Sequence, residues 1–229
     1  MPFASPILAE EKGSLWQASV LARASSSACM VMADVEPKTN SALTAQSVEQ
    51  FEDGFDDITV SNPEVLARWA ELQPSLRQMA AHDLHSVVVG QVLEHTTPLF
   101  VRLSELGQPS LKTDPGAAFT LLQSLTQSLS ARMCLIAVDL QREESLEVVA
   151  RVIGTVEAVL SGIENTPGLP PALEDAIWML RGDWDAIAGQ ASEIVKEGTL
   201  STQALARLVE EIGMLYTLTG EIGQQLRPS

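Results

Sequence analysis

The last part of the chain carries the pattern that most constrains the fold. Between positions 205 and 226, apolar residues recur at alternating spacings of three and four, the heptad pattern of a helix with one narrow apolar seam. Such a seam cannot bury itself, so the pattern predicts a helix that packs against partner helices. The seam consists of Leu205, Leu208, Ile212, Leu215, Thr219, Ile222 and Leu226, with Thr219 as its polar member.

Other segments carry apolar stripes that can serve as those partners. A break or kink is expected near 95–97, because Pro98 lacks a backbone donor. Short connections make sequential helices antiparallel, so we expect an all-α protein, an antiparallel up-and-down helical bundle of about five long helices. Periodicity and start signals place these helices at 75–106, 115–141, 145–164, 171–197 and 202–226.

The first 62 residues differ from the rest of the chain. A capping-box pattern predicts a helix over 15–33, weakened by its run of three serines, and a short second helix is expected over 44–51. The Asn-Pro pair at 62–63 is a cleaner start signal. We therefore expect residues 1–62 to form a partly ordered helical appendage and residues 63–229 to form the helical bundle domain.

Charge and hydropathy narrow the range of partners. Thirty acidic residues against fourteen basic ones give a formal charge of −16, which repels nucleic-acid backbones and anionic membranes. No run approaches the ~20 apolar residues of a membrane-spanning helix. We expect no nucleic-acid partner and no membrane insertion. Because the start lacks a signal-peptide pattern, a cytoplasmic location is expected, although secretion by a signal-peptide-independent route stays compatible with the serine-rich start.

Two cysteines, Cys29 and Cys134, are far apart in the sequence and lie outside any metal-binding spacing. The sequence indicates no disulfide framework, and Cys134, within the apolar segment 133–138, is interpreted as a small buried thiol. No phosphate-binding loop or ligand box is found in the sequence. We therefore expect neither a metal nor a cofactor.

His82 and His85 are the candidates for chemistry. On a helix they share a face, and a histidine exposed midway along a bundle helix can accept a phosphoryl group. Histidine phosphotransfer domains place Lys and Gly three and four residues after the histidine, whereas Val88 and Val89 follow His85 at those positions. A phospho-acceptor role for His85 or His82 is the alternative function, and no third ligand accompanies them for a metal site.

An acidic segment at 49–57 contains two phenylalanines, Phe51 and Phe55, among five acids. Segments of this kind can dock into a basic-rimmed apolar groove of another protein, with the two aromatic rings as anchors. The other interpretation is a solvated connector whose phenylalanines fold back on the bundle. Both interpretations stay open at this point.

The several apolar stripes and the lack of catalytic motifs favour a non-enzymatic protein–protein interaction module of the adaptor or scaffold type. The expected partner is another protein, with a second copy of the chain as one candidate, because the last seam can pair with its own copy as well as with its own chain. Two alternatives remain: a histidine phosphotransfer or other signalling bundle, and a secreted effector or secretion chaperone.

Overall fold

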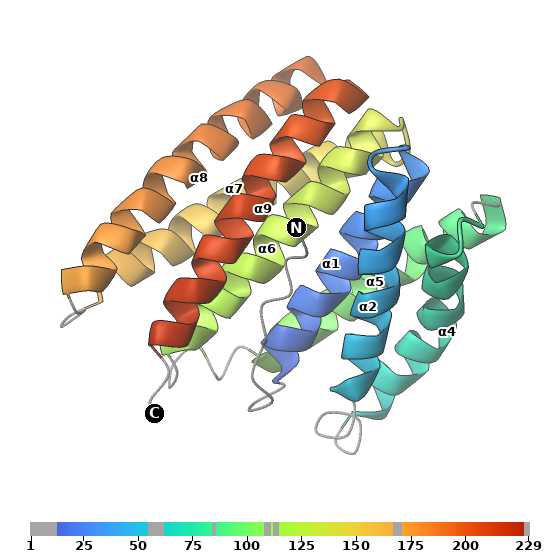
Figure 1. The fold of residues 1–229 in the computed structure, drawn as a ribbon, viewed down its shortest axis with the longest axis horizontal. Coiled ribbons are helices and arrows are strands. Elements are labelled where there is room, and N and C mark those ends of the chain that lie inside the picture. Colours follow the sequence, from blue (N-terminus) through green and yellow to red (C-terminus); the bar gives the residue numbers. More distant parts are fainter. Residues whose placement is uncertain are drawn as a thin grey trace.

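Helices account for nearly all of the described chain. The computed structural model describes residues 13–54, 62–83, 86–107, 111, 115–166 and 171–226. The all-α prediction is confirmed, but over these residues the chain forms eight helices and no strand rather than about five long helices (Figure 1). The helices are α1 (Ser14–Met32), α2 (Pro37–Asp53), α4 (Pro63–Ala80), α5 (Ser86–Gly107), α6 (Pro115–Ala137), α7 (Arg142–Glu164), α8 (Pro171–Glu197) and α9 (Thr202–Gln225).

Two helix starts follow the capping signals in the sequence. Asn62 Oδ1 accepts a hydrogen bond from the Val65 amide at 3.3 Å, and Pro63 takes the first helical position, where its missing N–H is not needed. Ser201 Oγ accepts from the Ala204 amide at 3.2 Å. These side chains satisfy amide groups that have no partner within the first turn, and they fix where α4 and α9 begin.

The predicted long helix over 75–106 is in fact the end of α4 and the whole of α5. The chain leaves α4 through a turn in which exposed His82 has φ 61°. Neither proline ends a helix: Pro74 lies inside α4, and α5 runs through Pro98 without the predicted break. Both prolines and the residues four positions before them are exposed, so water can reach the carbonyl groups that lose their partners.

The eight helices form two four-helix units. In the first unit α1, α2, α4 and α5 pack in a ring in chain order, and in the second α6, α7, α8 and α9 do the same. Within each unit, neighbouring helices are antiparallel. Between α2 and α4, for example, Ser41 near the start of α2 bonds to the Ala80 carbonyl at the end of α4, and Phe51 near the end of α2 packs on Trp69 in the first half of α4. Each unit is therefore an up-and-down bundle with its own apolar core.

The two units are structural repeats of each other. The turn after α1 has left-handed residues at Asp34 (φ 57°) and Glu36 (φ 41°), and the turn after α6 has them at Asp139 (φ 58°) and Gln141 (φ 44°). In each turn the residue between them donates its amide to the carbonyl five positions earlier, at 3.0 and 2.9 Å. In α1 and α6 and in the turns that follow them, equivalent positions are 105 residues apart, which is also the separation of the two cysteines.

Helix α1 lies at the centre of the molecule rather than in an appendage (Figure 1). Fifteen of its 19 residues are buried, and it contacts α2, α4 and α5 of its own unit as well as α6 of the other. The serines lower the helix propensity of this segment, but they are compatible with its buried position. Ser25 and Ser27 donate hydrogen bonds to carbonyl groups of their own helix, and their small side chains allow neighbouring helices to pack closely. The described part of 1–62 thus supplies half of the first unit.

Candidate functional site

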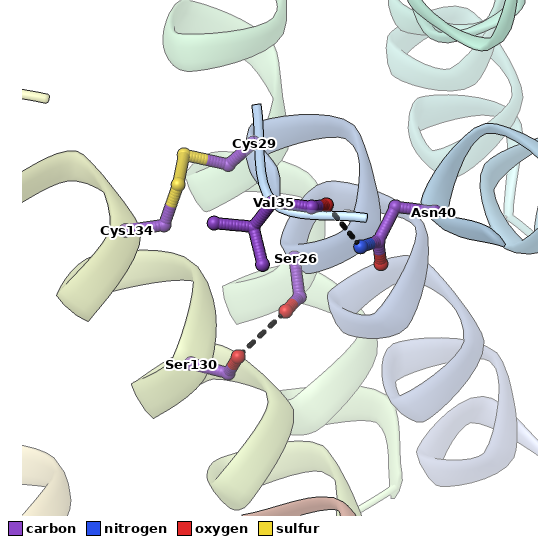
Figure 2. Close-up of a disulfide and its surroundings, with 6 residues drawn as sticks. All are labelled: Ser26, Cys29, Val35, Asn40, Ser130 and Cys134. Atoms are coloured by element: carbon purple, nitrogen blue, oxygen red, sulfur yellow. Dashed lines mark hydrogen bonds between the residues drawn. A yellow bond between two sulfur atoms is a disulfide. The ribbon is translucent and has the colours of Figure 1, made fainter. Parts of the chain in front are cut away.

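The two units meet along α1 and α6, which run in the same direction. Ser124 donates to the Leu15 carbonyl near one end of the contact, at 3.2 Å, and Ser26 donates to Ser130 at 2.8 Å near the other. Next to the second bond a disulfide joins Cys29 and Cys134, whose Cα atoms are 6.1 Å apart (Figure 2). The interpretation of Cys134 as a buried thiol is therefore wrong, although the residue is fully buried.

A cavity of about 350 Å³ lies beside this junction. Its walls come from α1, α4 and α5 of the first unit and from α6 and α7 of the second, so it exists only because the two units are joined. Cys29 of the disulfide is part of the wall. Most of the lining is apolar, including Met79, Val89, Val92, Phe100, Leu135 and Val152.

One charged side chain is buried in the cavity wall. Arg132, on α6, is only 6% exposed, and its Nη2 donates to Thr97 Oγ1 on α5. Its Nη1 is buried without a hydrogen-bond partner, and Glu144 Oε1 lies 3.6 Å away, in ion-pair range. A buried charged donor that lacks an acceptor is costly, and Arg132 brings such a group into the wall of the cavity.

Two further charges act on the Arg132 guanidinium. Burial lowers the pKa of Arg132, the Glu144 carboxylate raises it, and Arg151 on α7 lowers it. Arg151 also lines the cavity and is exposed, while the Glu144 side chain is 55% exposed. Because a guanidinium stays protonated in proteins, these three groups leave one positive charge at the cavity.

The residues proposed for phosphotransfer and docking lie elsewhere. His82 is exposed in the turn after α4, and His85 and Phe55 lie outside the described residues. Phe51 is fully buried, and its ring centroid lies 4.1 Å from that of Trp69. This burial places the Phe51 ring in the core of the first unit, which agrees with the interpretation that the phenylalanine folds back on the bundle.

The heptad seam of α9 packs inside the second unit. Six of its seven residues are buried, from Leu205 to Ile222, and Leu226 is partly buried. The helix packs on α6 and α8. Thr219 Oγ1 donates to the Leu215 carbonyl of its own helix at 2.5 Å, so the polar member of the seam makes a local hydrogen bond.

The sequence did offer a signal for the buried arginine. Arg132 occupies a position at heptad spacing between Leu129 and Ile136, on the apolar face of α6. A lone cation at such a position is unusual, since arginine is seldom buried without a partner. Arg151 and Glu144 carry no comparable signal, because charged residues on an exposed helix face are common.

Metal binding and membrane insertion find no support in the described part of the chain. Among the described residues no three His, Cys, Asp or Glu side chains gather as metal ligands. None of the described helices combines the length and the apolar character that crossing a membrane requires. Comparison with protein-family models, curated proteins and solved structures gives no match for this chain. The cavity between the units is thus the best-supported candidate site.

Proposed function

We propose that this protein is a non-enzymatic binding protein, and that its ligand is a small apolar molecule held in the cavity between the two units. The observation that carries the proposal is a cavity of about 350 Å³ with largely apolar walls drawn from five helices. Size and lining of this kind are typical of small-molecule sites. An occupant would add dispersion contacts that the walls otherwise lack, and would stabilise the folded state by mass action.

A neutral apolar fluorophore, N-phenyl-1-naphthylamine, tests the proposal. We expect saturable binding to the wild-type protein and its loss in Ala131→Phe, because Ala131 lines the cavity and a phenyl ring there would occupy the space. Ala204→Phe is the matched control, since Ala204 is exposed on α9, which does not line the cavity. Equal binding to the wild type and to Ala131→Phe, with unchanged helical circular dichroism, would overturn the proposal.

A protein partner, as expected from the sequence, is the second candidate. On α8 the neighbouring side chains of Trp178 and Met179 are 78% and 50% exposed. Exposed tryptophan is costly in water and is enriched among residues that dominate protein interfaces. A second copy of the chain is the first partner to test: light scattering should show a dimer that Trp178→Glu dissociates. A monomer at all concentrations would remove self-association from consideration.

The cellular location belongs to the same proposal. A cytoplasmic location is the expectation from the sequence, but thiols of cytosolic proteins are usually kept reduced, and a Cys29–Cys134 disulfide favours an oxidising compartment. The secreted alternative therefore has physical support. Alkylation of the protein in intact cells, before any reduction, discriminates: blocked thiols support the cytoplasm, and protected cysteines support export.

A further inference from the structure

The buried guanidinium in the cavity wall has an unused hydrogen-bond donor. Arg132 Nη1 has no hydrogen-bond partner, and the Glu144 carboxylate at 3.6 Å is too far for a hydrogen bond. The Glu144 side chain is largely exposed, so water screens its attraction for the arginine. Arg132 thus brings a charged group with an incomplete set of hydrogen bonds into the wall of a cavity that is otherwise mostly apolar.

The fold does not require an arginine at this position. At the 105-residue offset that relates α1 to α6, the position equivalent to Arg132 is Ser27. Ser27 is also buried, and its hydroxyl group bonds to the Ala24 carbonyl and to Thr44 Oγ1, at 3.2 and 2.8 Å. The same location in the repeat can therefore be filled by a small side chain with all its hydrogen bonds made.

The charge balance favours an occupant with one negative charge. Arg132 and Arg151 together exceed Glu144 by one positive charge, and the whole chain carries −16. A polyanion would be repelled by the chain as a whole, whereas a single carboxylate would pair with the extra positive charge. A carboxylate also accepts from a guanidinium in a favourable planar geometry.

We infer that the ligand is a medium-chain monocarboxylate, that is, a free fatty acid; this inference rests on the proposed function. Its carboxylate head group accepts a hydrogen bond from Arg132, and its aliphatic tail fills the apolar part of the cavity. Because a water molecule takes up about 30 Å³ of liquid, a volume of about 350 Å³ corresponds to roughly a dozen such volumes. A tail of about ten carbons is of the right size. Val92, Phe100 and Val152 are among the side chains it would contact.

Calorimetric titration with decanoate and 1-decanol tests the inference on the full chain. The two probes share the tail and differ in the head group. We expect wild-type protein to bind decanoate roughly 10- to 100-fold more tightly than decanol, because a hydrogen bond to a charged group typically contributes a free energy of that size. In Arg132→Gln this preference should disappear, while decanol binding is kept. Arg207→Gln, an equal change of charge at an exposed position of α9, should leave the preference intact.

A second variant covers the case in which Arg132→Gln fails to fold. Glu144→Gln removes the carboxylate that competes for the guanidinium, and it lies at an exposed position. It should bind decanoate several-fold more tightly than wild type and decanol equally well. Equal binding of decanoate and decanol by wild type would overturn the carboxylate inference while the apolar-ligand function stands. Binding of neither probe would overturn both.

Discussion

The disulfide between the units should contribute a large share of the stability. It closes a loop of 105 residues, and the chain-entropy relation gives about 4.8 kcal/mol at 25 °C for a loop of that length. Native domains are commonly stable by only 5–15 kcal/mol. The double substitution Cys29→Ala with Cys134→Ala should therefore lower the free energy of unfolding by several kcal/mol, and the loss of two buried sulfur atoms adds to this.

Urea unfolding followed by circular dichroism, with and without dithiothreitol, measures the effect. At an m-value of about 3 kcal/mol per molar urea, the midpoint of the double variant should fall by about 1.5 M. Reduced wild type should unfold near the double variant, and dithiothreitol should leave the double variant unchanged. If oxidised wild type and the double variant share one midpoint, the disulfide does not stabilise the protein by constraining the unfolded chain.

Two further predictions concern packing and charge. A Cβ at Gly107 would lie 2.3 Å from Leu15 Cγ, so Gly107→Ala should lower the free energy of unfolding by about 1–3 kcal/mol. A Cβ at Gly154 would meet nothing within 4 Å, so Gly154→Ala should raise the free energy of unfolding by about 0.5–1 kcal/mol. Thermal unfolding of each variant beside the wild type measures both changes. The hydrogen bond from Arg181 lowers the pKa of Glu164, so its stabilisation is present above the usual glutamate pKa and is lost as the pH falls through the lowered value. The difference in melting temperature between wild type and Glu164→Gln should therefore shrink between pH 6 and pH 3, and a difference that is constant with pH would contradict this assignment.

Helix positions were predictable where local chemistry fixes them. The range 171–197 was predicted and found for α8, and α9 begins at the predicted residue and ends one residue before the predicted end. In both cases an apolar stripe and a start signal agree. Prediction failed at 75–106, where the break was expected next to Pro98 and the chain instead turns at His82. Proline disrupts a helix less where its neighbouring carbonyl can bind water.

The central place of α1 could not be read from its own residues. Its serines lower helix propensity, and the reasons they suit the position lie in other helices: Ser26 bonds to Ser130, and Ser27 to Thr44. The disulfide could not be predicted for the same reason, because two cysteines 105 residues apart in the sequence become neighbours only when α1 and α6 pack in parallel. Tertiary contact, rather than local pattern, decides both features.

A comparison of the two halves of the sequence would have indicated the division into two units, which the patterns of single segments do not indicate. Cys29 and Asp34 are five positions apart, as are Cys134 and Asp139, and each pair ends the first helix of a unit. Two such pairs at one offset indicate an internal repeat, which predicts two four-helix units instead of one five-helix bundle. The repeat then makes the two cysteines equivalent residues, the natural candidates to meet where the first helices of the two units pack.

Comparison of the two units also distinguishes residues that helix packing requires from residues that a binding site requires. Positions that serve packing should carry similar residues in both units, as the cysteines and the turn aspartates do. A position where one unit has a small, fully bonded side chain and the other has a buried cation is a departure that packing does not explain. Ser27 and Arg132 are such a pair. Because the departure falls on the wall of the large cavity between the two units, we attribute the arginine to the ligand that this cavity is proposed to bind.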